Sequence, residues 1–393
     1  MKIAFDTWGT NRIFRNSGIY GYTMYLLQEF KHLAPEWGIQ VDAFVGSQGR
    51  HDVETIESSE GFAHIPAPDL DKFREWRLWG LNKAARRDRA DVVFVPHTQV
   101  IPLNFSQPIV ATIHDATPIR TPWQMNRKQT LMVRAYMWFT VHYADRIITD
   151  SENSKRDLVE IYGVNPARIQ VAYLGYDRGV FNSEPPDPAA LKALLTRFEI
   201  GRPYLFHHGT IQPRKNLEAL VRVHRLLLDR NPGLELDLVL AGPLGWLYES
   251  VVEAAQESSC SRGRVILTGA LENTDLALLL KGATVSVIPS FYEGFCFPMV
   301  EAMACGVPTV VSNSSCLPEV SGGVLRYFSP TEPEEMAEIV SLAIHDSLER
   351  QRLREAGLKR AAEFSWRRTG EQTLAVLMDA CGATPIRTTA LDL

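Results

Sequence analysis

The sequence of 393 residues contains few cysteines, and no two of them are spaced as Cys-x-x-Cys. Its five cysteines, an odd number, predict neither a disulfide framework nor a zinc site. Such cysteine usage fits a reducing compartment, so we expect a cytoplasmic protein. No apolar run approaches the roughly 18 residues of a membrane-spanning helix. The first residues follow a strand pattern rather than that of a signal peptide.

A strong excess of either charge is also missing. The net charge of −5 argues against a general nucleic-acid-binding protein. The chain shows no internal repeat and no low-complexity segment. Its 45% apolar and 22% charged residues are ordinary for a globular protein. The length predicts about two to three domains.

One stretch, residues 283–312, carries most of the information about function. It is typical of a strand, a Gly-containing loop, a helix and a second strand. Pro298 suits the first turn of this helix, and Gly306 suits the left-handed residue that ends it. The first amides of a helix favour a phosphate, because they have no partner inside the helix and form the positive end of its dipole. Glu293 and Glu301 flank these amides, and their carboxylates can accept hydrogen bonds from hydroxyl groups. The stretch therefore predicts a nucleotide-sugar site.

The same stretch resembles the donor-site motif of retaining GT-B glycosyltransferases of the large bacterial family four. Residues 289–308 read Pro-Ser-x-x-Glu-Gly-Phe-x-x-Pro-x-x-Glu-Ala-Met-Ala-x-Gly-x-Pro, as in that motif. Residues 209–216, Gly-Thr-x-x-Pro-Arg-Lys-Asn, resemble the second motif of the family and precede the first in the right order. The resemblance covers most of the chain and is strongest from residue 203 to 366.

The alternation of strand and helix patterns predicts parallel sheets with crossover helices. The resemblance implies an α/β fold of two Rossmann-like, doubly wound parallel-sheet domains that face each other across a cleft. We expect an acceptor-side domain in residues 1–178 and a nucleotide-sugar domain in residues 179–365. Residues 366–393 are expected to form a terminal helix that returns to the first domain, followed by a tail.

The resemblance also implies roles for individual side chains. Arg214 and Lys215 would hold the diphosphate and stabilise it as the leaving group. Glu293 would bind hydroxyls of the transferred sugar, and Glu301 those of the ribose. His114, in a His-Asp pair after a strand, would contact the other side of the sugar. The other donor-binding candidates lie at turns and in the central loop: Gly209, Gly269, Leu271, Gly294, Phe295, Cys296 and Phe297.

Cys296 departs from the pattern of the family, in which a small residue, usually glycine, stands at this position. Its side chain would lie where the backbone should approach the phosphate. Because cysteine is small, we expect phosphate binding to survive. The sequence leaves the geometry of the loop undecided.

The acceptor side is less defined. A loop is expected between the first strand and a helix from residue 22 to 33. In the resembling family this loop faces the acceptor and the donor phosphates, so Gly18 and Gly21 are candidate acceptor-side residues; the alternative is that they simply make the turn. Asp115 is expected to be a local or acceptor-side group.

Other chemistries find less support. Asp69-Leu70-Asp71 is formally an Asp-x-Asp metal motif, but two sheets of this order do not suit the metal-dependent fold. A phosphorylase of the GT-B fold would need a pyridoxal phosphate lysine, and nothing marks one. We therefore expect no metal and no cofactor. A catalytically inactive nucleotide-sugar-binding protein stays an alternative.

The resemblance implies a retaining hexosyltransferase that moves a sugar from a nucleotide diphosphate sugar, with GDP-mannose as the expected donor, to a hydroxyl of a carbohydrate or lipid-linked acceptor. The pathway would make cell-surface polysaccharide or glycolipid, and a UDP- or dTDP-sugar donor stays open. The segment Lys72 to Arg89 is expected to be a helix that interleaves basic and aromatic residues, and such a helix can lie on the inner face of an anionic membrane. The alternative is a half-buried helix with solvated bases. Residues 128–143 share this pattern less strongly.

Overall fold

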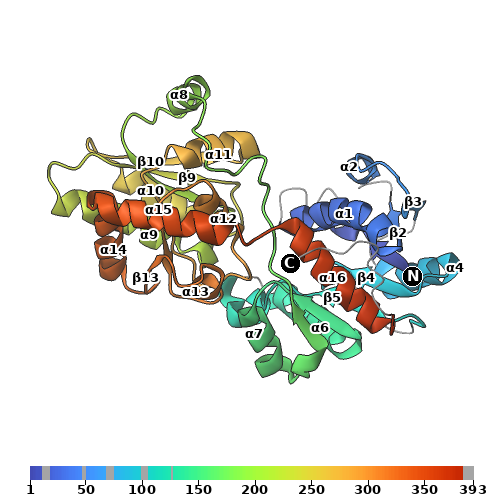
Figure 1. Cartoon of the computed structure of the whole chain (residues 1–393). Coiled ribbons are helices and arrows are strands. Elements are labelled where there is room, and N and C mark those ends of the chain that lie inside the picture. The colour runs from blue at the N-terminus through green and yellow to red at the C-terminus, as the bar shows by residue number, and fades with distance from the viewer. Residues whose placement is uncertain (11–17, 47–49, 68–74, 99–104, 125–126, 384–393) are drawn as a thin grey trace. The chain divides into compact units, whose positions relative to one another are not determined.

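The structure, a computed structural model, forms two compact units (Figure 1). The first unit consists of Met1–Ile119, Met125–Gly175 and Ser365–Leu393. The second consists of Tyr176–Phe364 together with Arg120–Gln124. The structure describes residues 1–10, 18–46, 50–67, 75–98, 105–124 and 127–383.

The first unit is built on a seven-stranded parallel sheet with the order β3-β2-β1-β4-β5-β6-β7. This order is that of a doubly wound nucleotide-binding sheet with one further strand, and it reverses between β1 and β4. The strands are β1 (Lys2–Asp6), β2 (Gln40–Val45), β3 (Phe62–Pro66), β4 (Val92–Val95), β5 (Ile109–Thr112), β6 (Arg146–Thr149) and β7 (Ile169–Val171).

Helices cover both faces of this sheet, so alternate residues of one strand face different helices. Phe5 packs edge-on against Phe30 of α1, with the ring centroids 5.6 Å apart. Ala4 and Val93 face the other way, into the core shared with α4, α6 and α7. Helix α16 packs beside α1, as Figure 1 shows. The helices of this unit are α1 (Gly18–Trp37), α2 (Arg50–Glu54), α4 (Leu81–Asp88), α5 (Thr117–Arg120), α6 (Arg127–Tyr143), α7 (Glu152–Tyr162) and α16 (Trp366–Ala380).

Two expectations for this unit were wrong in detail. Gly18 and Gly21 lie in the first turns of α1 and not in a loop, because the buried face of the helix already begins at Tyr22. The basic segment is not one regular helix: a π-helical turn, Trp76–Gly80, precedes the short α4. Residues 72–74 of this segment, and the Asp-x-Asp sequence at 69–71, lie outside the described residues.

The second unit repeats the plan with a six-stranded parallel sheet, in the order β10-β9-β8-β11-β12-β13. The order reverses between β8 and β11, which places the switch point of the sheet there. The strands are β8 (Tyr204–His208), β9 (Asp237–Ala241), β10 (Val265–Gly269), β11 (Val285–Ile288), β12 (Thr309–Ser312) and β13 (Arg326–Phe328).

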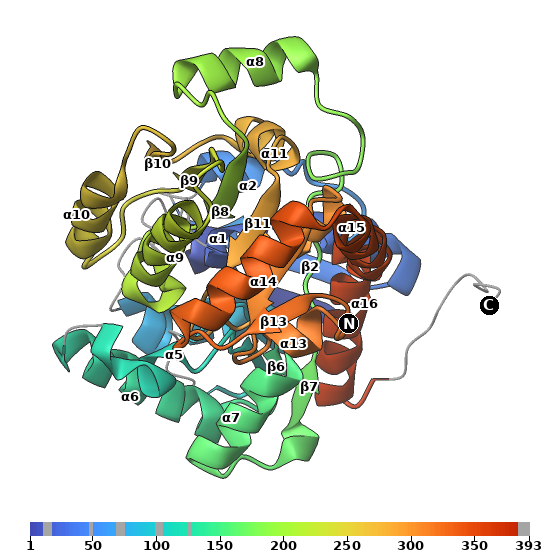
Figure 2. The same ribbon diagram turned by 90° about the vertical axis from the view of Figure 1, so that its left-hand side faces the viewer.

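Helices of the second unit pack as neighbours along the sheet. Helix α9 lies between α10 and α14 (Figure 2). Helix α12 packs against β11, β12 and α15. The segment 120–124 belongs to this unit, where Trp123 meets Phe291 edge-on with ring centroids 5.8 Å apart. The helices are α8 (Pro188–Arg197), α9 (Leu217–Arg230), α10 (Glu249–Ser258), α11 (Asn273–Lys281), α12 (Phe297–Ala304), α13 (Leu317–Val320), α14 (Pro333–His345) and α15 (Ser347–Ala361).

Candidate active site

A polar cluster of the second unit lies where β8 and β11 end. In open α/β sheets, ligands bind beyond the carboxyl ends of the strands at the switch point. Strand β8 leads to Gly209 and a short 3₁₀ turn, Pro213–Lys215, while β11 leads to the loop that carries Glu293. The two predicted donor motifs are therefore neighbours in space.

Glu293 is the centre of this cluster, and its side chain is buried, with the residue 4% exposed. Its Oε1 accepts hydrogen bonds from Nζ of Lys215 at 2.6 Å and from the hydroxyl of Ser290 at 2.7 Å. Its Oε2 accepts from the guanidinium of Arg214. The sequence predicts that Glu293 binds the sugar and that Arg214 and Lys215 bind the phosphates. It does not predict the direct contact among these three side chains.

The electrostatics of the cluster follow from this contact. Burial alone would raise the pKa of Glu293, but the positive charges of Arg214 and Lys215, with the hydrogen bonds, lower that pKa to about 2. The carboxylate is therefore ionised at neutral pH. Two positive side chains and one negative side chain leave a net positive charge, which suits an anionic ligand.

The guanidinium of Arg214 is held on several sides. It donates to the carbonyl oxygen of Tyr292 at 2.9 Å. When the amide of Gln212 is oriented to satisfy its neighbours, its oxygen accepts from Nε of Arg214 at 3.1 Å. The backbone carbonyl of Arg214 accepts from the amide of Phe291 at 2.8 Å. The side-chain bonds orient the planar, fork-shaped guanidinium, and the backbone bond ties the turn of Arg214 to the loop of Phe291.

Glu301 lies one turn inside α12, and its side chain is 16% exposed. Its Oε2 is 2.7 Å from Nε2 of His208, the last residue of β8. The neighbouring His207 is buried, and burial with the nearby charge of Lys215 lowers its pKa to about 3. Neither histidine was a candidate from the sequence, although their place at the end of a strand just before Gly209 was a usable signal.

In the central loop, Cys296 has a backbone conformation that is typical of glycine. Cys296 has φ +74°, in the left-handed region that glycine favours, and it precedes the first residue of α12. Its carbonyl accepts from the amide of Met299 at 3.1 Å. Burial raises the pKa of the Cys296 thiol to about 12, so the thiol is protonated at neutral pH. Gly294, Phe295 and Phe297 flank Cys296 in the same segment.

Three glycines form a row at the ends of β8, β9 and β10. The amide of Gly242 donates to the carbonyl of Gly269, and a Cβ on Gly242 would lie 2.1 Å from the carbonyl oxygen of Gly209. Gly209 and Gly269 themselves have φ of +132° and +71°. Leu271, half-buried, follows the end of β10. The row brings bare backbone to the same edge as the charged cluster.

In the first unit, the predicted residue His114 follows the end of β5, and its side chain is 20% exposed. Its Nδ1 lies 2.8 Å from Oδ2 of Asp150, which follows β6 directly, and its Nε2 lies 3.2 Å from the carbonyl oxygen of Pro96. Burial alone would lower the pKa of His114, but the charge and the hydrogen bond of Asp150 raise it. Tyr22 of α1 packs edge-on against the imidazole. Asp150 is not among the residues predicted from the sequence, although it directly follows a strand.

A second Asp–His pair was missed in the sequence. Asp6 ends β1, and its Oδ2 lies 3.0 Å from Nε2 of His97, which follows β4. Its Oδ1 accepts from the indole N–H of Trp76 at 3.0 Å and from the amide of Trp8 at 3.1 Å. Both members of the pair are buried, and they lie at the switch point of the first sheet. The signal was the position of two polar residues at the ends of adjacent strands.

The remaining acceptor-side candidates have local roles in the described structure. Asp115 accepts from the amide of Thr117 at 2.9 Å and so caps the turn that starts α5. Gly18 is exposed at the start of α1, and a Cβ on Gly21 would meet only the ring of Tyr25 at 4.0 Å.

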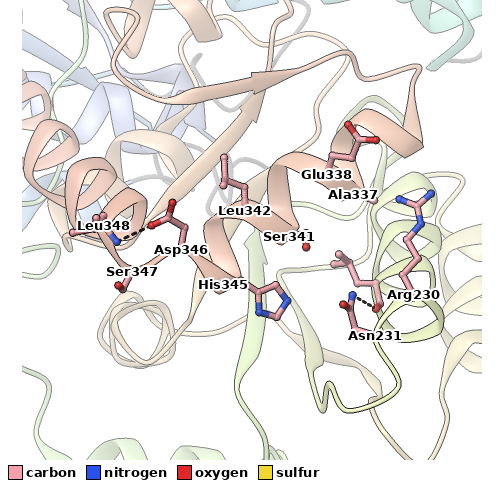
Figure 3. A pocket seen from close by; sticks show the side chains of 11 residues that line it. Arg230, Asn231, Ala337, Glu338, Ser341, Leu342, His345, Asp346, Ser347 and Leu348 are labelled. Atoms are coloured by element: carbon pink, nitrogen blue, oxygen red, sulfur yellow. Dashed lines mark hydrogen bonds between the residues drawn. The ribbon is translucent and has the colours of Figure 1, made fainter.

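A pocket of about 720 Å³ opens elsewhere in the second unit, between the ends of α9 and α14 and the start of α15 (Figure 3). Arg230 and Asn231 line one side, and His345 and Leu348 line the other, as Figure 3 shows. The donor-site candidates are not among the described residues that line it. It is therefore separate from the charged cluster.

No group of three or more His, Cys, Asp or Glu side chains in the described part of the chain is arranged to hold a metal ion. Likewise, none of the helices in the described ranges is both long and apolar enough to cross a bilayer.

The fold and the charged cluster define a class of protein. Two doubly wound sheets of the same strand order, with basic residues and two glutamates at the switch point of the second, are the architecture of a GT-B glycosyltransferase. The chain belongs to this class and to glycosyltransferase family 4. Residues 21–179 match the description Glycosyltransferase Family 4, and residues 196–360 match Glycosyl transferases group 1.

Known proteins agree with this assignment. The chain is 28% identical over 291 residues to O-antigen chain mannosyltransferase B of Escherichia coli, covering 74% of this chain and 75% of that protein. It is 27% identical over 235 residues to the serotype-specific mannosyltransferase WbdA of Escherichia coli, where the match covers 58% of this chain but only 28% of that protein. The fold is similar to that of Anabaena HepE in complex with UDP and glucose, with a TM-score of 0.73, 17% identity and coverage of 96% and 100%.

Proposed function

We propose that this glycosyltransferase is a retaining hexosyltransferase that uses a nucleotide diphosphate sugar, best GDP-mannose, and glycosylates a hydroxyl of a growing cell-surface polysaccharide or glycolipid. The observation that carries the proposal is the buried cluster of Arg214, Lys215 and Glu293 at the switch point. The mannosyltransferase relatives support the choice of mannose.

In this proposal Arg214 and Lys215 bind the diphosphate and stabilise its charge as the glycosidic bond breaks. Positive charge then comes from the protein, so neither a metal nor a cofactor is required. The acceptor hydroxyl attacks the same face of the sugar from which the diphosphate leaves, and the leaving phosphate takes the hydroxyl proton. The new glycosidic bond therefore retains the anomeric configuration.

The two glutamates have different tasks. A carboxylate offers about four acceptor positions, and Lys215, Ser290 and Arg214 use three of those of Glu293. Glu293 therefore orients the two bases and keeps about one position for a hydroxyl of the transferred sugar. Glu301 has one hydrogen bond to His208, and its remaining acceptor positions bind the ribose hydroxyls.

The first unit supplies the acceptor side in this proposal. His114, held by Asp150, contacts the transferred sugar from that side. The acceptor is a carbohydrate or a lipid-linked glycan, and the enzyme works in the cytoplasm at the inner face of the membrane.

The test is transfer by the purified protein with GDP-mannose, UDP-glucose and dTDP-sugars and a set of mannoside acceptors, in EDTA and with Mn²⁺ or Mg²⁺. We expect transfer from GDP-mannose that survives EDTA, and an α-linked product by NMR from the α-linked donor. A β-linked product would exclude retention, and activity only with added metal would exclude the metal-free mechanism. Transfer only from a UDP- or dTDP-sugar would mean that this sugar nucleotide, and not GDP-mannose, is the donor. Tight donor binding without transfer to any acceptor or to water would favour an inactive binding protein.

A further inference from the structure

The first unit exposes an unusual number of large apolar side chains on two helical segments. Six of the twelve exposed large hydrophobic residues among the described ones lie on the π-helical turn before α4 and on α6. On α6, Leu131 and Trp138 are 72% and 44% exposed. On the π-helical turn, Trp79 is 58% exposed. The others are Leu78, Met132 and Tyr143.

These two segments cover the same face of the sheet. The buried sides of α4 and α6 belong to one core cluster, which includes Ala85 of α4 and Met137 of α6. That cluster takes only one set of alternating strand residues, such as Val93 and Ile147. The exposed sides of α4 and α6 therefore both point away from this face, opposite to the side on which α1 packs.

The charged side chains exposed on these segments are mostly basic, although the whole chain has a net charge of −5. The acidic residues are Glu75, which is exposed and has a partner, and Asp88, which accepts from Nζ of Lys2 at 2.8 Å. The exposed basic residues are Lys83, Arg86, Arg87, Arg89, Lys128 and Arg134. The surface is therefore locally positive on a negative protein.

Helix α6 arranges its exposed residues as a stripe. Lys128, Leu131, Ala135, Trp138 and His142 recur at intervals of three or four residues, so they share one face of the helix. The indole of Trp138 stacks on the imidazole of His142, with ring centroids 4.2 Å apart. This stripe borders a groove of about 420 Å³ between α6 and α7, which lie beside each other in Figure 2.

We propose that this outer side of the first unit, formed by the π-helical turn, α4 and α6, binds an anionic lipid bilayer. Tryptophan and leucine side chains enter the boundary between headgroups and acyl chains, where an amphipathic aromatic ring is favoured. The basic side chains of both segments contact the anionic headgroups. Basic residues around exposed aromatics match a negative bilayer better than a protein surface of mixed charge.

The proposal extends the predicted contact of the segment 72–89 by assigning the apolar anchor to α6. Only the purpose of membrane binding rests on the proposed function, because a lipid-linked acceptor would be held at the same bilayer. Binding itself needs neither donor nor turnover, so it can fail or succeed independently of the transferase activity.

The test is sedimentation of the full chain with vesicles of neutral phosphatidylcholine and with vesicles that also contain anionic phosphatidylglycerol. We expect sedimentation only with the anionic vesicles, and weaker binding as salt is raised, because salt screens exposed charges. Equal sedimentation with both vesicles, or none with either, would overturn the proposal. Self-association of the lipid-free protein through this face, lost in Trp138→Ser, would overturn it as well and assign the face to a second copy.

Two double variants of α6 and one control double variant in the second unit locate the surface. Leu131→Ser with Trp138→Ser should lower the vesicle partition coefficient at least tenfold, whereas Trp246→Ser with Leu247→Ser, 47% and 57% exposed in the second unit, should not. Arg134→Ala with Lys128→Ala should lower it about tenfold at low salt. Unchanged melting temperatures show that each variant is folded. Wild-type binding by the α6 variants, or an equal loss in the control pair, would exclude α6 as the anchor.

Discussion

Both sheets gather polar side chains at the carboxyl ends of their strands, yet the two clusters differ in chemistry. The first unit uses Asp–His pairs, one of them Asp150 with His114. The second uses a glutamate with an arginine and a lysine. A histidine can change its charge near neutral pH, whereas a guanidinium cannot. Arg214 therefore keeps its charge near neutral pH, which suits the proposed diphosphate, whereas the charge of the first cluster can change with pH.

The basic residues of the second cluster should give the largest effect. Lys215→Ala removes a buried charge from the proposed leaving-group site and leaves Glu293 with one cation. We expect the rate of transfer to fall by about 10² to 10³, the loss found when one stabilising donor is removed from a preorganised site.

The exposed lysine of α8 gives the control for this variant. Lys192→Ala, in the same unit, should keep wild-type rates. Steady-state kinetics on both variants decide the question. Near-normal turnover by a folded Lys215→Ala would separate the cluster from catalysis.

The two glutamates should give intermediate and distinguishable effects. Loss of a hydrogen bond to a charged group costs about 1.5–3 kcal/mol, a factor of roughly ten to a hundred or more. Glu293→Gln should mainly lower kcat, because the sugar changes its charge in the transition state while the ribose does not. Glu301→Gln should mainly raise KM.

Calorimetry with the nucleoside diphosphate checks this assignment, since that product has the ribose but no sugar. Glu301→Gln should weaken its binding, and Glu293→Gln should change it little, because both basic residues stay in place. A larger loss in Glu293→Gln would mean that its main role is to organise Arg214 and Lys215 for the phosphates.

The pair of Asp150 and His114 in the first unit should give the smallest effect. We expect it in the pH dependence of stability rather than in the rate of transfer. The pKa of His114 is raised in the folded protein, so its contribution to stability is present below pH about 6.5 and is lost as pH rises through the raised pKa. Glu293 behaves in the opposite way: its contribution is lost only as pH falls from about 4.5 through about 2.

Asp150→Asn removes the charge that raises the pKa of His114, so this pKa should fall, because burial opposes the charged form. NMR titration of the imidazole, assigned with His114→Gln, measures the shift. Burial also raises the pKa of Asp150, so the stability lost in Asp150→Asn should be greatest between the pKa of Asp150 and that of His114, and should shrink as pH rises through the raised pKa of His114. Asp187→Asn, at the exposed start of α8, serves as the control. An unchanged His114 titration would remove Asp150 as its positioning residue.

Local signals explain what the sequence predicts well. Gly306 ends α12 with φ +66°, as its place after a helical pattern suggests, and Pro298 lies in the first turn. The alternation of strands and helices predicts two parallel sheets. The three-residue strands β7 and β13 are too short to show a pattern.

Contacts between distant residues could not be predicted in the same way. Arg214 and Glu293 are 79 residues apart, and Asp6 and His97 are 91 apart, so only the order of the strands brings them together. The left-handed backbone at Cys296 shows the converse. The sequence suggests a changed loop, yet the structure keeps a glycine-like conformation there with a side chain that is small enough to bury.

Helix α16 has a consequence for how the protein is made. It completes the first unit, where Leu374 and Leu377 are fully buried and Gly370 lies against Leu33 of α1. The second unit, by contrast, is almost entirely one continuous stretch, Tyr176–Phe364. On a ribosome the second unit is therefore complete while the first still waits for its last helix. The part of the chain that is synthesised first is the last to close its core.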